Sequence, residues 1–225
     1  MAIISGGLDS AVLAHHLAAE GHELSLLSFD YGQRHVRELA SAVVIAGRLG
    51  ASWKRVDLRS IRALLPGSSL TDNEVEVPEG HYAAETMKAT VVPNRNAIML
   101  ACAWGHAVAI GAQVVAAAVH AGDHFIYPDC RPEPLGALAR AFQGCNEGFG
   151  DPKLRATFPF ISWTKAEIVR HGHQLGVPFD ATWSCYKGGE FHCGKCGTCV
   201  ERQLAFRQSR VPDPTVYATI TGYLE

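Results

Sequence analysis

The amino-terminal residues join a short apolar run to a glycine turn and a helical segment, and this combination constrains the fold more than any other stretch. Ala2-Ile3-Ile4 precede Ser5-Gly6-Gly7-Leu8-Asp9-Ser10, and helical periodicity begins at Ala11. Two adjacent glycines let a backbone present its N–H groups to a ligand, and the start of a helix adds unpaired N–H groups and the positive end of its dipole. The stretch is typical of an anion-binding turn between a strand and a helix.

The side chains of this turn indicate which anion it binds. Ser5 and Ser10 offer hydroxyl donors, whereas the carboxylate of Asp9 would repel a bare phosphate unless a Mg²⁺ ion lay between them. A Walker A loop requires a Gly-Lys-Ser/Thr ending and the dinucleotide fingerprint requires a third glycine, and neither is present here. A tight turn that merely caps a helix remains the structural alternative. We predict a site for a metal-bound polyphosphate.

Strand-like and helix-like segments alternate along the rest of the chain. Apolar runs predict strands at 23–29, 53–58 and 114–119, and apolar spacing predicts helices at 36–50, 132–149 and 165–176, the last opened by a Thr164–Glu167 capping box. Alternation of this kind indicates an α/β fold with a doubly wound parallel sheet covered on both faces. We expect an α/β domain at 1–180 and a smaller region at 181–225.

Residues 97–119 carry no charged side chain and imitate a membrane span. His106, Gln113 and two glycines interrupt the run, so we predict a buried helix followed by a buried strand. The apolar start of the chain is short and lacks a basic leader, and we therefore expect a cytoplasmic protein without membrane contact. The formal net charge of -2 gives no basic excess for nucleic acid, which favours a small-molecule substrate.

Polar residues gather where the predicted strands end, at 30–35, 94–96 and 120–131. Ligands of open α/β sheets bind at the carboxyl ends of the strands, so these segments are candidate binding residues. Residues 66–93 lose periodicity and are rich in Gly, Pro, Ser and acidic residues. A loop of that length in a compact domain is typical of a lid or an interface.

Four of the seven cysteines lie close together near the carboxyl terminus. Cys185, Cys193, Cys196 and Cys199 follow the spacing Cys-x7-Cys-x2-Cys-x2-Cys, with glycines inside the short turns. Four thiolates complete a tetrahedral shell and leave no open position, which predicts a structural zinc ion. An iron–sulfur cluster also takes four cysteines, and the spacing does not distinguish the two.

The Ser5–Ser10 turn resembles the Ser-Gly-Gly-x-Asp-Ser loop of the ATP pyrophosphatases, also called the PP-loop family, which includes GMP synthetase and tRNA thiolation enzymes. The resemblance implies a Rossmann-like sheet of the adenine nucleotide alpha hydrolase type. It also implies a loop that holds the β and γ phosphates of ATP, bound with Mg²⁺, while AMP is transferred to the substrate and pyrophosphate leaves.

Within that family, the combination of motifs resembles the 7-cyano-7-deazaguanine synthases. The matching stretches are the turn, Tyr31-Gly32-Gln33-Arg34-His35, residues 93–96, Gly122-Asp123, Tyr127-Pro128-Asp129-Cys130-Arg131 and the four cysteines. Asn94 stands where the pattern has glycine. The resemblance implies a ligase of queuosine biosynthesis that converts 7-carboxy-7-deazaguanine and ammonia, with ATP, to the nitrile.

The resemblance also implies roles for individual residues of this chain. It implies catalytic roles for Ser5, Asp9, Ser10, Arg95 and Lys165. ATP would contact the segment Ile4, Ser5, Gly6, Gly7, Leu8, Asp9, Ser10, Ala11, Val12, Leu13 and Ala14. The acid substrate would contact Tyr31, Gln33, Arg34, His35, Asp123, Tyr127, Asp129 and Arg131. We also expect a homodimer, with the apolar stretch 216–224 as the candidate contact.

Two other functions share features of this sequence. A tRNA-thiolating relative would use paired cysteines to carry sulfur, but it should show a basic surface for RNA. A module that senses ATP without consuming it would share the phosphate-binding turn. Release of pyrophosphate on addition of 7-carboxy-7-deazaguanine would distinguish the enzyme from the sensor.

Overall fold

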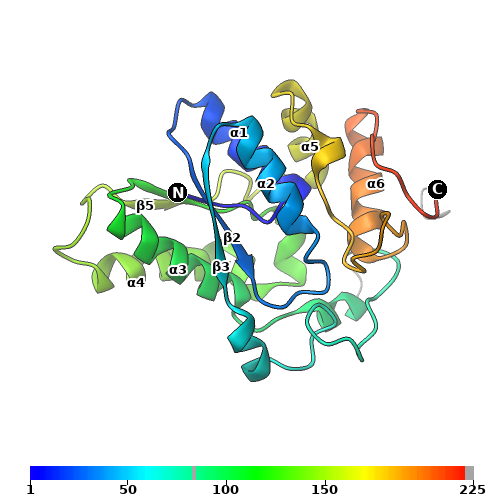
Figure 1. Cartoon of the computed structure of the whole chain (residues 1–225), viewed down its shortest axis with the longest axis horizontal. Helices are drawn as coiled ribbons and strands as arrows, with labels where there is room; N and C mark the ends of the chain where they lie inside the picture. Colours follow the sequence, from blue (N-terminus) through cyan, green and yellow to red (C-terminus); the bar gives the residue numbers. More distant parts are fainter. Residues whose placement is uncertain (83–84, 221–225) are drawn as a thin grey trace.

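The computed structural model describes residues 1–82 and 85–220 and is built on a parallel sheet (Figure 1). Five strands pair in the order β3-β2-β1-β4-β5, and every neighbouring pair is parallel. The strands are β1 (Ala2–Ile3), β2 (Ser25–Asp30), β3 (Ser52–Asp57), β4 (Val114–Ala116) and β5 (Arg155–Thr157). The predicted α/β fold with a parallel sheet is confirmed.

Helices cover both faces of the sheet. They are α1 (Leu8–Ala19), α2 (Glu38–Arg48), α3 (Arg95–Ala109), α4 (Pro132–Cys145), α5 (Lys165–Gln174) and α6 (Gly197–Ser209). Buried residues of α1, α2, α5 and α6 form one apolar cluster, and those of α3 and α4 form a second. Figure 1 shows these two groups on opposite sides of the strands. Such double winding follows from the right-handed crossovers that parallel strands require.

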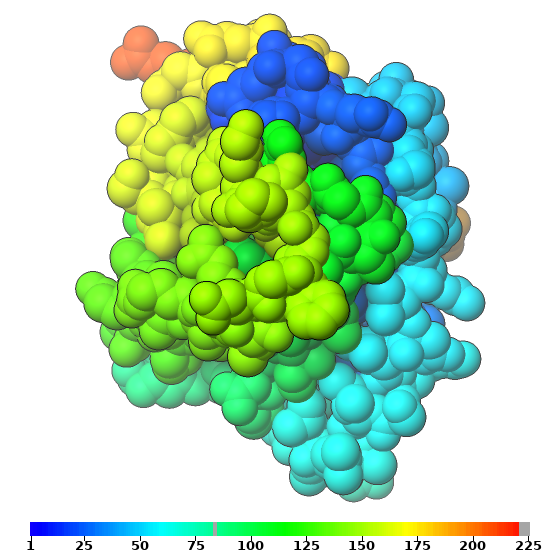
Figure 2. Space-filling view, turned by 90° about the vertical axis from the view of Figure 1, so that its left-hand side faces the viewer, coloured from blue at the N-terminus to red at the C-terminus, as the bar shows by residue number. Residues whose placement is uncertain are grey.

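The strand order places a ligand crevice at β1. From β1 the chain pairs with β2 on one side and with β4 on the other, so the direction of winding reverses there. Open α/β sheets bind ligands at the carboxyl ends of the strands beside such a reversal. The turns that follow α1, α3 and α4 lie at the other ends of the strands, where β2, β4 and β5 begin. These turns meet on the face seen in Figure 2.

The predicted elements agree with the structure in type and differ at their ends. Residues 97–119 form most of α3 and then β4, as predicted, but the strand is only three residues long. The strand β5 was not predicted, because Arg155-Ala156-Thr157 is a short, half-exposed edge segment without an apolar run. Among the described residues, no helix combines the length and apolarity needed to cross a bilayer.

The segment 66–93, predicted as a lid, packs against the rest of the protein. Leu70 and Met87 are fully buried, and residues Glu85–Thr90 form a short 3₁₀ helix. The backbone of Glu79 bridges to Cys196, and the Gly80 amide donates to the Lys195 carbonyl oxygen at 3.0 Å. This segment is therefore attached to the four-cysteine region. Its movement as a lid remains a prediction.

Asn94, which stands where the family pattern has glycine, adopts a left-handed conformation. Its φ is 56°, in the region that glycine occupies without strain. Asparagine is among the few other residues that tolerate this conformation, because its short polar side chain bonds locally. Asn94 precedes α3, so the departure from the pattern preserves the turn that presents Arg95.

The region after residue 180 consists of the cysteine turns, α6 and an extended end. Ala205 and Phe206 of α6 join the apolar cluster of α1 and α5, and α6 lies beside α5 in Figure 1. A boundary at residue 180 stays a prediction. Of the predicted dimer contact at 216–224, Val216 and Ile220 are exposed, and residues 221–225 lie outside the described part of the chain.

Candidate active site and metal centre

A cavity of about 210 Å³ opens at the carboxyl ends of β1, β2 and β4. Its wall includes the turn before α1, the residues after β2 and the start of α3. The segment after β4, the first residue of α5, residues 183–186 and the first turns of α6 complete it. Segments far apart in the chain thus meet where the strand order predicts a ligand.

The glycine turn has its N–H groups directed at serine oxygens. The amides of Ser5 and Gly6 both donate to Ser10 Oγ at 3.2 Å, and the Gly7 amide donates to Ser5 Oγ at 3.1 Å. These hydroxyl oxygens stand where the oxygens of an anion would accept the same bonds. A phosphate entering the turn would replace the serine acceptors, which would free the hydroxyls to donate to it.

Gly6 cannot carry a side chain. Its φ is +94°, and a Cβ there would lie 1.9 Å from the carbonyl oxygen of Glu38. The turn therefore packs directly against the first residue of α2. This contact fixes the direction in which the turn faces the cavity.

Replacing Gly6 by alanine is expected to lower the free energy of unfolding by about 4 kcal/mol, because backbone strain and a backbone collision combine. Gly21→Ala is the matched control, since Gly21 has a φ of +82° but open space around it. That variant should lose only about 1–2 kcal/mol. Urea unfolding of the two variants measures the difference, and equal losses would contradict the close contact at Gly6.

Lys165 and Asp9 form an ion pair inside the cavity. Lys165 is the first residue of α5, and the predicted capping box of Thr164 and Glu167 holds that helix start in place. Lys165 Nζ lies 2.5 Å from Asp9 Oδ2 and 3.1 Å from Glu201 Oε2. Burial alone would lower the pKa of Lys165, but the carboxylates of Asp9 and Glu201 outweigh it and raise that pKa. The lysine is a fixed positive charge beside the glycine turn.

The second carboxylate oxygen of Asp9 is available for a cation. Asp9 Oδ1 is buried, and among the described residues it has no hydrogen-bond partner. An unsatisfied buried carboxylate oxygen is costly unless a ligand completes it. The donor set is that of a hard divalent cation such as Mg²⁺, which binds one or two carboxylates together with phosphate oxygens.

Aromatic rings line the side of the cavity that lies beyond β2. The Arg95 guanidinium lies 5.8 Å from the ring centre of Tyr31 and 5.5 Å from that of Tyr127. Tyr127 Oη is 3.2 Å from Tyr186 Oη. Burial raises the pKa of Tyr31 to about 12, so its hydroxyl is neutral. A planar ligand with a negative group would find both stacking surfaces and a positive charge here.

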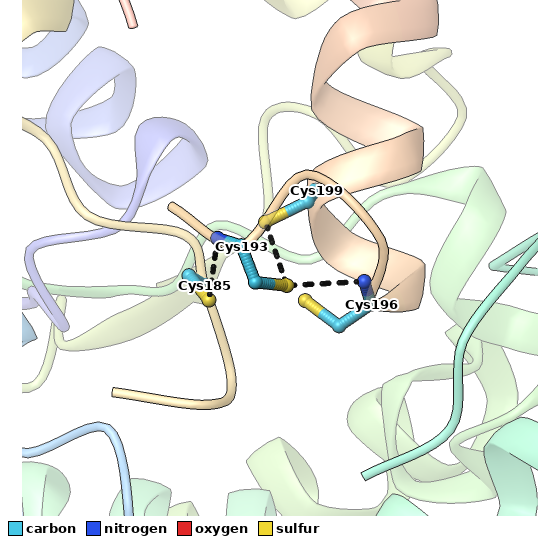
Figure 3. Close-up of side chains that lie close together, drawn as sticks. All are labelled: Cys185, Cys193, Cys196 and Cys199. Carbon is cyan, nitrogen blue, oxygen red and sulfur yellow. Dashed lines mark hydrogen bonds between the residues drawn. The ribbon is translucent and has the colours of Figure 1, made fainter. Parts of the chain in front are cut away.

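The four cysteines predicted as metal ligands converge in the structure. Their sulfur atoms all lie within 4.8 Å of one another, and the sulfurs of Cys193 and Cys199 are 3.9 Å apart (Figure 3). Tetrahedral zinc with Zn–S bonds of about 2.3 Å requires sulfur separations of about 3.8 Å. The amides of Lys195 and Cys196 donate to Cys193 Sγ at 3.4 and 3.3 Å, which stabilises a thiolate. The cluster could hold a metal ion.

The cysteine cluster also shapes one wall of the cavity. Cys196 precedes α6 as its N-cap and Cys199 lies in its first turn, while Thr198 and Glu201 of the same helix line the cavity. Residues on either side of Cys185, namely Trp183, Ser184 and Tyr186, line it as well. A metal bound by the cysteines would therefore hold these side chains in place.

Comparison with known proteins decides the family. The family model described as "Queuosine biosynthesis protein QueC" matches residues 1–210. The chain belongs to the QueC family. It is 58% identical over 215 residues to the 7-cyano-7-deazaguanine synthase of Rhizobium johnstonii. This alignment covers 96% of this chain and 90% of that protein. The enzymes of the same name from Brucella anthropi and Brucella ovis are 56% and 58% identical, over 96% of this chain and 92% of each relative.

Most of the residues predicted to be catalytic, to contact ATP or to contact the acid substrate line the cavity. They are Ile4, Ser5, Gly7, Leu8, Asp9, Ser10, Tyr31, His35, Arg95, Asp123, Tyr127 and Lys165. Gly6 packs against the backbone of α2. The side chains of Ala11, Val12, Leu13 and Ala14 are buried in the core. These four residues therefore support the turn from the helix behind it. Their predicted contact with ATP remains a prediction.

Four residues predicted to bind the acid substrate are used elsewhere in the fold. The Arg34 guanidinium donates to the carbonyl oxygens of Asp72 and Val75 at 2.7 and 3.0 Å. The Asp129 carboxylate accepts from the amide of Asn96 at 2.9 Å, and Arg131 donates to the His124 carbonyl oxygen at 2.8 Å. The Gln33 side chain bonds to the Phe29 carbonyl oxygen, the Tyr31 amide and the Glu38 carboxyl group. Among the described residues these side chains bond to protein groups and do not line the cavity, and their contact with the acid remains a prediction.

Several residues of this QueC-family cavity were not predicted from the sequence. They are Glu38, Tyr82, Glu201, Ser184, Tyr186 and Thr198. Glu201 is the most important, because its carboxylate contacts Lys165 and lies 3.8 Å from His120 Nε2. A helix starting at the cysteine cluster would have placed Glu201 one turn after Gly197, but nothing local in the sequence directs that face toward the cavity.

Proposed function

We propose that this chain is a 7-cyano-7-deazaguanine synthase, which converts 7-carboxy-7-deazaguanine and ammonia to the nitrile with consumption of ATP. Relatives of that name align over nearly the whole chain. The observation that carries the proposal is the single cavity in which the glycine turn, the Lys165–Asp9 pair and the Arg95 aromatic wall all meet. Such a cavity suits an acid that must be joined to AMP.

The first step activates the carboxylate, which is a poor electrophile on its own. A carboxylate oxygen attacks the α-phosphorus of ATP, the bond from that phosphorus to the bridging oxygen breaks, and pyrophosphate leaves. The amides and hydroxyls of the Ser5–Ser10 turn would hold the leaving pyrophosphate, and Lys165 would offset its charge. Mg²⁺ bound with ATP, with Asp9 as its protein ligand, would supply further neutralisation of the phosphates.

Ammonia then replaces AMP on the activated acid. Its nitrogen attacks the acyl carbon, AMP leaves with one carboxylate oxygen, and the product is the amide. The amide oxygen attacks a second ATP in the same way, and loss of AMP together with the amide protons yields the nitrile. Both activations need the same phosphate-binding turn, so one site serves the two steps.

Water must be kept from the activated acid, because it competes with ammonia. Tyr82, from the 66–93 segment, reaches the cavity and donates its hydroxyl hydrogen bond to Asp123 Oδ1 at 3.1 Å. We propose that this contact closes the cavity during turnover. Opening it would let the activated acid hydrolyse, which wastes ATP.

Replacing Tyr82 by phenylalanine is expected to raise the ratio of AMP released to nitrile formed by about twofold or more, since the net value of one hydrogen bond is roughly 1 kcal/mol. Tyr217→Phe is the matched control, because its hydroxyl bonds to Asp213 away from the cavity. Quantifying AMP and nitrile in the same reaction measures the ratio. A ratio that stays unchanged in Tyr82→Phe would contradict the closing role.

The function itself is tested by incubating the protein with ATP, Mg²⁺, ammonium and 7-carboxy-7-deazaguanine. We expect formation of the nitrile, AMP and pyrophosphate, each dependent on the acid. Pyrophosphate release without the acid would instead favour a different substrate. Transfer of sulfur to tRNA would favour the thiolation enzymes, although the net charge of -2 supports a small-molecule substrate and no nucleic-acid partner.

We further propose that the metal of the cysteine cluster is a structural zinc ion. The closed set of four sulfurs supports this assignment, since it leaves no position for a substrate. None of the seven cysteines forms a disulfide, which fits a reducing compartment and supports a cytoplasmic location. A homodimer through the exposed Val216 and Ile220 remains a prediction, which sedimentation analysis would test.

A further inference from the structure

Two polar side chains, His35 and Glu38, line the cavity beyond β2. His35 is almost fully buried, and its Nδ1 has no hydrogen-bond partner among the residues that the structure describes. Glu38, the first residue of α2, is buried beside it and lines the same cavity. Buried polar groups that lack partners are costly, so this edge of the cavity is incomplete without a ligand.

Gln33 fixes the orientation of the Glu38 carboxylate. Its Nε2 donates to the Phe29 carbonyl oxygen at 3.0 Å and to Glu38 Oε1 at 3.1 Å, and its Oε1 accepts from the Tyr31 amide at 2.9 Å. His35 Nε2 also lies nearest to Oε1 of Glu38, at 3.5 Å. Within the described part of the chain, no group donates a hydrogen bond to Glu38 Oε2.

The charge state of this edge is set by its burial. Burial raises the pKa of Glu38 to about 8 and lowers the pKa of His35 to about 3. The imidazole is therefore neutral, and burial favours the protonated, neutral form of Glu38 near pH 7 while no ligand is bound. N–H donors from a ligand would stabilise the carboxylate form, so the pKa of Glu38 should fall and its proton should leave when the ligand binds.

A planar ring system fits next to this polar edge. The His35 ring lies 5.1 Å from the ring of Tyr186, whose hydroxyl is 3.2 Å from that of Tyr127. Tyr31 and Tyr127 flank the Arg95 guanidinium on the same side of the cavity. His35 and Glu38 thus lie at one end of a part of the cavity that has aromatic walls. A flat heterocycle could stack there and form hydrogen bonds with Glu38 through its polar edge.

We propose that Glu38, oriented by Gln33 and His35, accepts hydrogen bonds from the ring N–H and the 2-amino group of the deazaguanine. This inference rests on the proposed function. A deazaguanine presents two adjacent donors, which match a carboxylate that can only accept. Adenine presents one amino donor beside a ring nitrogen with a lone pair, and that lone pair would face the second carboxylate oxygen. Glu38 therefore selects the acid substrate.

The decisive variant is Glu38→Gln, which keeps the size of the side chain and the acceptor for Gln33. We expect the KM for 7-carboxy-7-deazaguanine to rise roughly 10- to 100-fold, since hydrogen bonds to a charged group are lost, while the KM for ATP stays within about twofold. Glu85→Gln is the matched control, because Glu85 is exposed and its carboxylate pairs with Lys88. Both of its KM values should match those of the unmodified protein.

A second measurement needs no variant. The unmodified protein should bind 7-carboxy-7-deazaguanine at least tenfold more tightly than the analogue that lacks the 2-amino group, because a site built to bond an amino group rejects its absence. Equal binding would overturn the proposal, as would a Glu38→Gln variant in which only the KM for ATP rises. Failure of the unmodified protein to form AMP with the acid would instead overturn the proposed function.

Discussion

Replacing Asp9 by alanine is expected to lower kcat by about 10³-fold, which is the scale observed when one preorganised electrostatic contact to a reacting phosphate or oxyanion is removed. Asp9 contacts Lys165 through one carboxylate oxygen and leaves the other, buried oxygen free for a cation. Loss of this carboxylate would remove the proposed protein ligand of Mg²⁺. It also releases Lys165 from one of its two carboxylate partners.

The fold should survive this change, because Lys165 keeps its contact with Glu201. Circular dichroism and the unfolding midpoint therefore serve as the check that the variant is folded. Asp180→Ala is the matched control, since Asp180 is exposed and lies outside the cavity lining. That variant should retain full turnover. Normal acid-dependent AMP formation by a folded Asp9→Ala variant would rule out the role in metal binding.

Replacing Cys196 by serine is expected to release the bound metal and to lower the free energy of unfolding by roughly 5 kcal/mol or more, because the binding free energy of a structural zinc ion contributes directly to folding. Cys196 is fully buried and sits at the start of α6. Its loss would leave three sulfurs around the ion. The change would also loosen the helix that presents Glu201 to Lys165, so turnover should fall with stability.

Metal analysis of the purified protein gives the first reading, with one zinc per chain expected for the unmodified protein and little for the variant. Chemical unfolding gives the second. Cys145→Ser is the matched control, because Cys145 is exposed at the end of α4, and it should change stability by no more than about 0.5 kcal/mol. Full retention of metal by the Cys196→Ser variant would show that the ligand set is wrong.

The sequence predicted those parts of the structure whose signal is local. The glycine turn, the alternation of apolar runs and the capping box at Thr164 each depend on a few neighbouring residues, and the structure contains all three. The four cysteines converge because short turns bring them together, which their spacing already indicates. The resemblance of the sequence motifs to the 7-cyano-7-deazaguanine synthases is confirmed by the family model and the relatives.

The remaining features depend on contacts between distant segments. Glu201 approaches Lys165 only because α5 and α6 pack side by side, and no pattern in either segment alone predicts that contact. Arg34 and Asp129 lie in motifs that pointed to substrate binding, but backbone groups of the 66–93 segment and of the start of α3 already bond to their side chains. Polar residues at strand ends can thus either contact a ligand or hold the loops that do, and only the three-dimensional contacts separate these roles.

The central claim is that AMP is transferred to the carboxylate of the acid, and oxygen transfer tests it most directly. The acid is labelled with ¹⁸O in its carboxylate and incubated with ATP, Mg²⁺ and ammonium, and the released nucleotide and pyrophosphate are analysed by mass spectrometry. Because the nitrile retains no oxygen from the carboxylate, the account predicts that the label is found in AMP and that pyrophosphate is unlabelled. Label in inorganic phosphate, with ADP as the nucleotide product, would contradict it.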